Sequence, residues 1–415
     1  IEVKTEIGYG SPLAGTNKVH GAPLGEENTS SLKEYLGWET EEFIIDESVT
    51  DHFNKVIGDR GHEAHETWNE LLAEYEDKYP EDAAQLKADM AGELPENWAE
   101  NLPTYKTGDK ALASRKSSEA AIQVIADQIP SFWGGSADLF SSNNTYIADG
   151  GDFLPGSYEG KNIWYGVREF AMAAILNGII LHGGSKSYCA TFFVFSDYMK
   201  AAVRLAALSE IPSIFTFTHD SVAVGEDGPT HEPIEQLAMW RALPNLQVIR
   251  PADGNETSQA WRVAIERTEG PTMLVLSRQN LPVVDGTETK AKDGVDKGAY
   301  VIAEAAEEAS GIIIATGSEV ALAVEAKDLL AQDGIHVNVV SMPSWERFDE
   351  QDEAYRESVL PKDNRNRMSV EAGATFGWEK YLGFEGLAYG IDRFGASGEG
   401  GAVMEYMGYS IDQVA

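Results

Sequence analysis

Cysteine, basic residues and long apolar runs are all scarce in this chain of 415 residues. Cys189 is the one cysteine, which excludes an intramolecular disulfide and a zinc site built on thiolates. Lysine and arginine number 32 against 68 aspartates and glutamates, so the net charge is -36. This balance disfavours nucleic acid and anionic membranes as partners, because both attract clustered cations. The longest strongly apolar run, 170–181, is too short to cross a bilayer. Together with the single cysteine, this predicts a cytoplasmic protein.

The chain has neither an initiator methionine nor a charged-then-apolar leader. It opens in an alternating stretch, 1–8, that is typical of a strand, and we expect further chain to precede it in the natural product. An acidic stretch over 48–90 has apolar residues at helical spacing and predicts a helical connector. With 43% hydrophobic residues the chain can bury two or three cores, so we expect a multidomain globular protein.

Strand-like and helix-like segments alternate from residue 111 onward. The sequence predicts helices at 117–129, from 168 and at 320–330, and strands near 212, 246 and 272 and at 312–318 and 337–340. Such alternation predicts an α/β fold in which a mostly parallel sheet is wrapped by helices and a second α/β unit follows. Residues 285–300, rich in Asp, Lys, Gly and Thr, are the expected linker between the two.

The loop 219–233 concentrates two histidines and several acids directly after an apolar run, 211–217. That run is typical of a buried strand, because its bulky side chains show no polar alternation. Loops at the carboxyl ends of such strands carry the chemistry of α/β enzymes. A solvated loop rich in Gly and Pro would have a similar composition, so the loop alone leaves both interpretations open.

Glu169 stands at the start of a strongly apolar predicted helix. One interpretation is favourable pairing with the helix dipole, since acids are common in first turns. The other is a carboxyl group held among apolar neighbours so that it can hold or share a proton.

Phe192, Phe195 and Tyr198 recur at every third residue and predict an aromatic stripe along one side of a helical turn. Such a stripe is usually core packing, but it also suits the stacking of a flat heteroaromatic cofactor. Arg115, Ser142 and Arg278 each fall near a predicted strand or helix end. In so acidic a chain these residues indicate a local anion site or, alternatively, ordinary interdomain ion pairs.

Four separated motifs, taken together, closely resemble transketolase. They are 134–139, 167–172, 219–233 and 277–282. The resemblance extends more loosely to both ends of the chain. It implies that 1–104 is the tail of a diphosphate-binding domain with a helical connector, 105–287 the pyrimidine-binding domain, 288–294 a linker and 295–415 the carboxyl-terminal α/β domain of the transketolase type.

The resemblance also implies thiamine diphosphate as cofactor, with magnesium or calcium. Glu169 matches the glutamate that hydrogen-bonds the aminopyrimidine and favours its imino tautomer, from which the thiazolium ylid forms; the cofactor then performs the carbanion chemistry. Phe195 matches the phenylalanine stacked on the pyrimidine, and Phe192 and Tyr198 complete that pocket. Asp138 falls where the family has an aspartate near the cofactor at the subunit boundary.

Substrate residues follow from the same resemblance. His20 resembles a histidine that touches both the cofactor diphosphate and the substrate. Asp227 resembles the aspartate that recognises the configuration of a hydroxyl group of the donor. His231 resembles a histidine that hydrogen-bonds hydroxyl groups near the cleaved carbon–carbon bond. The cradle for the substrate phosphate is implied to consist of Arg115, Ser142, His219 and Arg278. The family's active sites form between subunits, which implies a homodimer.

The chain departs from the family pattern in two places. The family binds its divalent ion through a Gly-Asp-Gly motif and a downstream Asn, and this pattern does not occur here. We therefore expect no metal ligand in this chain and place the ligands upstream of Ile1. The segment 394–400 also departs from the usual pattern. We interpret that change as drift, because the carboxyl-terminal domain supplies little of the family's active site.

The implied function is transketolase activity in the pentose phosphate pathway: reversible transfer of a two-carbon ketol unit from a ketose phosphate, such as xylulose 5-phosphate, to an aldose phosphate, such as ribose 5-phosphate. Dihydroxyacetone synthase or deoxyxylulose-phosphate synthase would share Glu169 and the aromatic stripe. A catalytically incomplete fragment or subunit, acting only in folding and dimerisation, is a non-enzymatic alternative. A glycosidase is disfavoured, because no acid and nucleophile at the required separation are identified.

Overall fold

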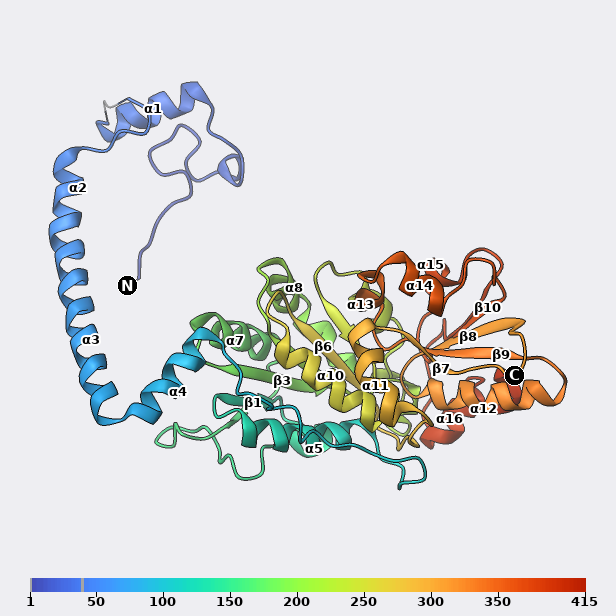
Figure 1. Ribbon diagram of the computed structural model, residues 1–415. Helices are drawn as coiled ribbons and strands as arrows, with labels where there is room; N and C mark the ends of the chain where they lie inside the picture. The colour runs from blue at the N-terminus through green and yellow to red at the C-terminus, as the bar shows by residue number, and fades with distance from the viewer. Residues whose placement is uncertain (1, 39–40) are drawn as a thin grey trace. The chain divides into compact units, whose positions relative to one another are not determined.

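The computed structural model describes residues 2–38 and 41–415, and the chain divides into a first unit, Ile1–Ala84, and a second unit, Gln85–Ala415 (Figure 1). No helix among the described residues is long and apolar enough to cross a membrane. The helical segments of the first unit and its boundary are η1 (Asn17–Val19), α1 (Glu26–Leu36), α2 (Glu47–Phe53), the π-helical η2 (Asn54–Gly58), α3 (Asp59–Lys78) and α4 (Pro80–Ala91).

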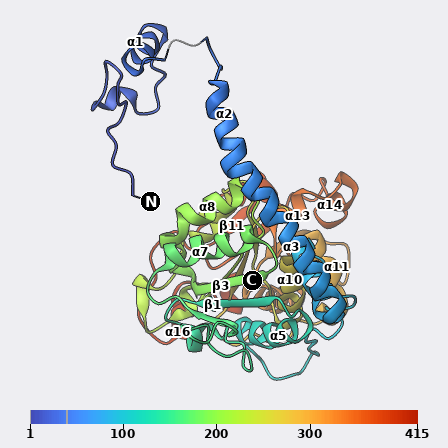
Figure 2. The same ribbon diagram turned by 90° about the vertical axis from the view of Figure 1, so that its left-hand side faces the viewer.

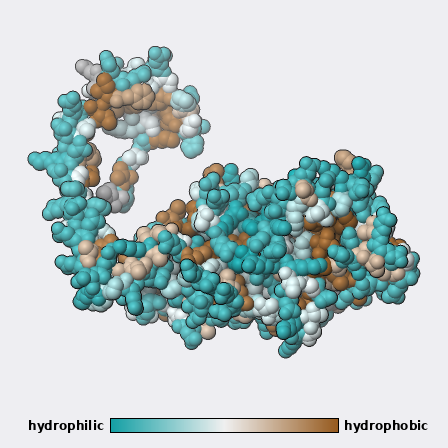
Figure 3. All heavy atoms as spheres, viewed as in Figure 1, coloured by the Kyte–Doolittle hydropathy of each residue, from teal (hydrophilic) through white to brown (hydrophobic). Residues whose placement is uncertain are grey.

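The first unit buries almost none of its side chains. The segments α2, η2 and α3 follow one another without a break as a single long helix (Figure 2), which confirms the helical prediction for 48–90. Among the described residues of this unit, Ser11 and Ala83 are the buried ones, and apolar side chains lie on its surface (Figure 3). The strand predicted over 1–8 is wrong for the described residues 2–8, because no neighbouring strand pairs with them and an unpaired strand leaves its backbone groups unsatisfied.

The second unit contains two sheets. The first is six-stranded, in the order β2-β1-β3-β4-β6-β5, and all its pairs are parallel. Its strands are β1 (Phe132–Ser136), β2 (Asn162–Trp164), β3 (Lys186–Phe192), β4 (Ile214–Thr218), β5 (Gln247–Ile249) and β6 (Thr272–Leu276). Every residue of β4 and β6 is buried, as expected for central strands with both faces covered.

Helices cover both faces of this sheet (Figure 1). Its helical segments are α5 (Ser114–Gln128), α6 (Phe140–Asn143), α7 (Glu169–His182), η3 (Phe193–Met199), α8 (Lys200–Leu208), η4 (Val222–Val224), η5 (Gly228–Thr230), α9 (Gln236–Arg241) and α10 (Gly254–Glu266). On one face the core contains Leu176 of α7 and Val203 of α8, and on the other Ile122 of α5 and Trp261 of α10. The predicted parallel sheet wrapped by helices is thus confirmed.

The second sheet is five-stranded, in the order β11-β10-β8-β9-β7, with β7 antiparallel to β9. Its strands are β7 (Tyr300–Ala303), β8 (Gly311–Ala315), β9 (Val337–Ser341), β10 (Arg367–Val370) and β11 (Leu387–Tyr389). Its helices are α11 (Thr287–Lys297), α12 (Glu319–Gln332), α13 (Trp345–Asp349), α14 (Glu353–Val359), α15 (Glu379–Leu382), α16 (Gly400–Tyr406) and α17 (Ile411–Val414). This is the second α/β unit that the sequence predicted.

The expected linker is helical. Residues 288–294 lie inside α11, which Gly286 and Gly298 bracket in the left-handed conformation, with φ of 91° and 82°. Glycine adopts this conformation at little steric cost and commonly ends a helix. The two sheets are therefore joined through an ordered helix that packs against α10.

Candidate functional site

Four neighbouring strands of the first sheet end beside one another. Phe192 is the last residue of β3, Asp138 and His219 follow shortly after β1 and β4, and Arg278 follows β6. Because these strands are parallel and adjacent, their carboxyl ends meet at one edge of the sheet. The sheet therefore gathers residues separated by more than a hundred positions in the sequence.

An aromatic wall, formed by Phe192, Phe195 and Tyr198, begins where β3 passes into η3. The rings of Phe192 and Phe195 are nearly parallel, with centroids 6.0 Å apart and planes 6° apart. Residues three apart eclipse one another in a 3-10 helix, so η3 places Tyr198 beside Phe195, at 6.3 Å. Phe192 is buried, whereas Tyr198 is 66% exposed. The stripe is therefore only partly core, and part of it remains accessible.

Glu169 is the first residue of α7 and is half-buried. Helix α7 packs against η3, which carries Phe195 and Tyr198. The helix itself buries Met172 and Leu176 in the core and exposes Phe170 and Ile175. A carboxylate thus begins the helix that adjoins the aromatic wall.

His219 is held from several sides. Its ring stacks on Phe192 with centroids 3.6 Å apart, and its Nδ1 lies 2.8 Å from Thr218 Oγ1. Its Nε2 lies 3.5 Å from Nη1 of Arg115. The backbone of His219 has φ of 63°, which is uncommon outside glycine and is a recurrent sign of a functional position.

The charges around His219 are mainly positive. Burial, together with the nearby Arg115, Arg278 and His231, lowers the pKa of His219 to about 3, and burial is the largest cause. Burial also lowers the pKa of Arg115, with Arg278 contributing in the same direction. These mutual effects show that the two arginines and the two histidines lie close together. The imidazole of His219 is neutral near pH 7.

Arg115 is the most enclosed cation of this group. Its Nη1 donates a short hydrogen bond to the backbone oxygen of Ser142, while its buried Nε has no partner among the described residues. The side chain of Arg278 is 40% exposed and forms a loose ion pair with Glu226 at 3.8 Å. Both guanidinium groups therefore keep hydrogen-bonding capacity for an anion.

The structure brings most of the predicted site residues together, but not all. His231 contacts Phe195 edge to face at 5.4 Å. Asp227 lies in the same loop, just before η5, with an exposed side chain, and Asp138 is also exposed. His20 follows η1 in the first unit and is exposed. The roles of Asp227, Asp138 and His20 stay predictions.

Sequence reasoning missed the buried polar residues behind the site. Asn143 accepts a hydrogen bond from Thr218 and donates one to Ser136, and all three are fully buried. Asp220, the residue after His219, accepts from Arg250 at 2.9 Å. Polar residues within a fully buried strand, such as Thr216 and Thr218 in β4, were the available signal.

The segment 394–400, interpreted from the sequence as drift, packs against the site loop. Ser397 Oγ donates to the backbone oxygen of Glu226 at 2.8 Å. A Cβ on Gly400 would lie 2.6 Å from the backbone oxygen of Ala223, and one on Gly395 would lie 1.7 Å from Glu232 Oε2. Gly400 thus lies too close to the backbone of Ala223 to carry a side chain without a shift. The interpretation of 394–400 as drift stays a prediction.

Glu232 lies at the end of the site loop and is 2% exposed. Burial raises its pKa to about 7, although the backbone N–H groups of Ala396 and Gly225 act in the opposite direction. The apolar side chains of Val222, within the loop, and of Ile234, directly after it, belong to the core cluster of the second sheet. The loop is therefore anchored in both sheets of the second unit.

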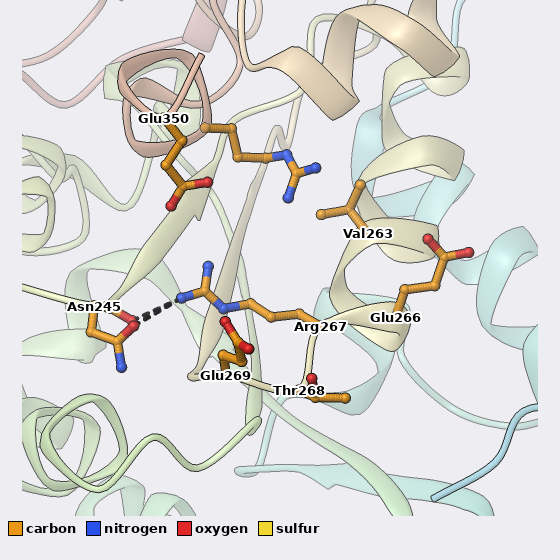
Figure 4. A pocket seen from close by; sticks show the side chains of 8 residues that line it. Asn245, Val263, Glu266, Arg267, Thr268, Glu269 and Glu350 are labelled. Atoms are coloured by element: carbon orange, nitrogen blue, oxygen red, sulfur yellow. Dashed lines mark hydrogen bonds between the residues drawn. The ribbon is translucent and has the colours of Figure 1, made fainter. Parts of the chain in front are cut away.

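A pocket of about 330 Å³ lies away from these residues, near the amino end of β6 (Figure 4). Arg267 lines it and donates to Gly270 at 3.0 Å and to both oxygens of Asn245. Arg347, which also lines it, donates to the backbone oxygens of Val295 and Asp296. Three glutamates share the pocket with these two arginines. Its guanidinium groups are thus already engaged, and we do not assign the functional site to it.

Across residues 2–38 and 41–415, no group of three or more His, Cys, Asp or Glu side chains is arranged to hold a metal ion.

Three family models match successive parts of the chain. The model of the transketolase pyrimidine-binding domain matches residues 110–284 and that of the transketolase-like C-terminal domain residues 298–410. The model of the transketolase thiamine diphosphate binding domain matches residues 1–95.

The chain is similar to proteins named transketolase from Geobacillus stearothermophilus, at 54% identity, and from Bacillus subtilis, at 52%. Each match covers 100% of this chain and 62% of the relative, so the chain spans under two thirds of their length. Its fold is similar to that of a transketolase from Pichia stipitis solved in complex with sedoheptulose 7-phosphate. That match has a TM-score of 0.93 and 45% identity, and covers 100% of this chain and 61% of that one.

Proposed function

This chain belongs to the transketolase family, and from that premise we propose that it takes part in ketol transfer. In this reaction a two-carbon unit passes reversibly from a ketose phosphate, such as xylulose 5-phosphate, to an aldose phosphate, such as ribose 5-phosphate, in the pentose phosphate pathway. The proposal includes the domain limits 105–287 for the pyrimidine-binding domain and 295–415 for the carboxyl-terminal domain, joined through 288–294.

The observation that carries the proposal is the group of Arg115, His219 and Arg278 beside the aromatic wall. In a chain with a net charge of -36, two guanidinium groups that influence one another and keep free donors suit a phosphate dianion. We propose that these residues, with Ser142, bind the substrate phosphate. His231 and Asp227 lie in the loop beside them and are proposed to contact sugar hydroxyls.

The aromatic wall suits the pyrimidine half of thiamine diphosphate. The ring of Phe195 is half-buried and nearly parallel to that of the buried Phe192, so it offers a face for a flat heteroaromatic ring. When bound, this cofactor supplies the carbanion chemistry of the reaction. Phe195 would stack on the ring, with Phe192 and Tyr198 beside it. Asp138 is proposed to lie near the ring and His20 to contact the diphosphate.

Glu169 is proposed to hold a proton shared with a ring nitrogen of the pyrimidine. Its position supports this role, because α7 begins at Glu169 and packs against η3. A carboxyl group in hydrogen-bond reach of a ring nitrogen can favour one protonation state of that ring. The described residues offer no cluster for magnesium, so the contribution of this chain to cofactor binding is proposed for the pyrimidine half, together with His20.

The family supports a homodimer in the cytoplasm, and the surface of α7 agrees with self-association. Phe170, Ile175 and Leu181 of this helix are 52%, 49% and 68% exposed. Exposed apolar side chains on one element favour a protein interface, and a second copy is the proposed occupant.

The test is Glu169→Gln, assayed with thiamine diphosphate, magnesium, xylulose 5-phosphate and ribose 5-phosphate in a preparation in which the unsubstituted protein turns over. We expect kcat to fall by about 100-fold or more, because the amide cannot share the proton, with an unchanged circular dichroism spectrum. Glu159→Gln, which neutralises an exposed carboxylate, is the matched control. Undiminished turnover in Glu169→Gln would contradict the proposed role of Glu169.

A second candidate is a catalytically incomplete fragment or subunit that acts only in folding and dimerisation. It is favoured by one observation, that the described residues hold no metal cluster. Equilibrium dialysis of thiamine diphosphate with magnesium separates the two candidates: near-absence of binding supports the fragment, and binding that weakens in Phe195→Ala supports the enzyme.

A further inference from the structure

The chain leaves β4 through two residues whose side chains have different partners. His219 has φ of 63°, and its ring lies against Phe192 and Arg115 at the carboxyl edge of the first sheet. The next residue, Asp220, is 2% exposed. Its Oδ2 accepts from Nε of Arg250 at 2.9 Å and lies 2.8 Å from Nη2 of the same guanidinium group. The backbone beside the site histidine is thus tied to a buried arginine.

That arginine is held by segments that follow strands of the second sheet. Arg250 comes directly after β5 of the first sheet. Its backbone N–H nevertheless donates to the backbone oxygen of Pro343 at 2.9 Å, and its backbone oxygen accepts from Gly317 at 3.2 Å. Pro343 follows β9 and Gly317 follows β8. The main chain of Arg250 is therefore fixed to the carboxyl edge of the second sheet.

The guanidinium group of Arg250 also meets a second carboxylate. Its Nη1 donates a short hydrogen bond to Glu319 and another to Thr316 Oγ1, at 3.0 Å. Glu319 in turn accepts from the backbone N–H of Ala372, just after β10, at 3.0 Å. Burial lowers the pKa of Arg250, but Glu319 and Asp220 raise it by more, so the group stays charged. One buried cation thus joins Asp220 to the second sheet.

The conformation of His219 depends on such support. A residue other than glycine adopts a positive φ at a steric cost and keeps it only where the surrounding contacts enforce it. Oδ1 of Asp220 has no hydrogen-bond partner among the described residues, so the position of this carboxylate depends on Arg250. Because both side chains are buried, water cannot replace either partner without a large cost. The path of the backbone at His219 is therefore set by this ion pair.

We propose that the buried ionic group of Asp220, Arg250 and Glu319 positions the phosphate site. Through the backbone of His219 the group holds the imidazole beside Arg115, so that both side chains can contact the phosphate of the substrate. The proposal deepens and rests on the proposed function, because His219 and Arg115 are taken to bind that phosphate. The second sheet thereby contributes to substrate binding, although the residues proposed to bind the phosphate all precede it in the chain.

The first test compares two buried carboxylates. Asp220→Asn keeps the shape of the side chain and removes its charge. Glu256→Gln is the matched control, because Glu256 is also fully buried and accepts from Tyr300 and Ser341 of the second sheet at 2.7 and 2.6 Å. By calorimetric titration we expect the dissociation constant of ribose 5-phosphate to rise by roughly 10-fold in Asp220→Asn and to stay within about twofold in Glu256→Gln. An unchanged constant in Asp220→Asn overturns the proposal.

Steady-state kinetics separate positioning from general damage. With Asp220→Asn we expect KM to rise for xylulose 5-phosphate and to stay unchanged for erythrulose, a ketose without a phosphate. The value of kcat should stay within about twofold of that of the unsubstituted protein. Equal losses with both ketoses would mean that Asp220 supports the fold alone, and they overturn the proposal.

A second variant keeps the proposal testable if Asp220→Asn does not fold. Glu319→Gln leaves the ion pair of Asp220 with Arg250 in place and neutralises the other carboxylate. We expect KM for xylulose 5-phosphate to rise by roughly threefold, again without a change for erythrulose, because Glu319 is one contact further from His219. An unchanged KM in a Glu319→Gln protein with an unaltered circular dichroism spectrum overturns the proposal.

A crystal structure of the Asp220→Asn variant decides the positioning without a substrate. We expect the backbone of His219 to leave the left-handed region and its imidazole to turn away from Arg115, and an unchanged geometry overturns the proposal. If the unsubstituted protein binds no ribose 5-phosphate, the proposed function fails while this structure still decides the positioning. If it binds, and Asp220→Asn and Glu256→Gln behave alike, only the positioning fails.

Discussion

The two sheets of the second unit both place polar side chains at the carboxyl ends of their strands, but those side chains are engaged differently. At the edge of the first sheet, Nε of Arg115 has no partner among the described residues, and Arg278 forms a loose ion pair with the exposed Glu226, 3.8 Å away. At the edge of the second, Glu319 and Glu371 pair with Arg250 and Arg241, and no side chain in these pairs is more than 3% exposed.

The difference shows that position at a strand end does not by itself identify a site. Thr316 follows β8 just as His219 follows β4, yet its hydroxyl donates to Glu371 at 2.6 Å and accepts from Arg250. The ionic group of the second sheet is closed to solvent and its charged groups pair with one another, although Nε of Arg241 has no partner among the described residues. The first sheet keeps Arg278 40% exposed and only loosely paired, where a ligand can reach it, and this is why we assign the substrate to it.

Replacing a member of the buried ionic group of the second sheet should lower the stability of the fold more than any other substitution proposed here. Arg250→Met leaves Asp220 and Glu319 buried without their partner, so we expect the free energy of unfolding to fall by about 3–5 kcal/mol in urea denaturation. Lys362→Met, which removes a 67% exposed cation with two ion pairs, is the control and should leave the free energy of unfolding nearly unchanged, because exposed ion pairs contribute little to stability. Similar losses in both variants would remove the distinction between a buried and an exposed group.

Glu232 lies where the two sheets meet and should make stability depend on pH. Its folded pKa is raised to about 7 from 4.5, so its contribution is fully present below 4.5 and is lost as pH rises through 7. Relative to Glu232→Gln, the unsubstituted protein should lose on the order of 3 kcal/mol between these limits. Denaturation series at several pH values measure this difference. A constant difference across the range would show that Glu232 is not held protonated.

A substitution at the carboxyl edge of the first sheet should instead change stability little and substrate binding strongly. Arg278→Met should change the free energy of unfolding by no more than about 0.5 kcal/mol, because the residue is 40% exposed and loosely paired. We expect KM for ribose 5-phosphate to rise by about 10-fold or more, since a charge-assisted hydrogen bond is lost. The exposed Lys116, replaced by Met, controls for net charge. An unchanged KM in Arg278→Met would contradict the phosphate assignment.

The pocket at the opposite edge of the first sheet should show the smallest effect. Arg267→Met removes hydrogen bonds to Gly270 and Asn245, so we expect a loss of about 1 kcal/mol in stability. Steady-state kinetics should give KM and kcat within about twofold of the unsubstituted values, because no proposed site residue lies there. A large rise in KM would move the substrate to this pocket.

The alternation of elements and the aromatic and charged side chains were predictable from the sequence, because both leave local patterns. The mostly apolar runs of the buried strands β4 and β6 and the helical spacing in α5 and α12 depend on neighbouring residues alone. The strand predicted for the stretch 2–8 was wrong because the prediction also depended on a local pattern. Alternation indicates a strand, but a strand also needs a neighbouring strand to pair with, and a local pattern does not show whether one is present.

The supporting residues were not predictable, because their roles arise from contacts between distant segments. Asn143 and Thr218 are 75 positions apart and have their roles only through the hydrogen bond that joins them. The close contacts of Gly400 with Ala223 and of Gly395 with Glu232 likewise join segments that are far apart in the sequence. Periodicity reports which face is buried, but it does not report which distant atom a polar group meets.

The most direct test of the central claim is a crystal structure of the protein with ribose 5-phosphate. The account predicts that the phosphate lies within hydrogen-bonding distance of both Arg115 and Arg278, at the carboxyl edge of the first sheet. A phosphate bound between Arg267 and Arg347, or anywhere else away from Arg115 and Arg278, would contradict it.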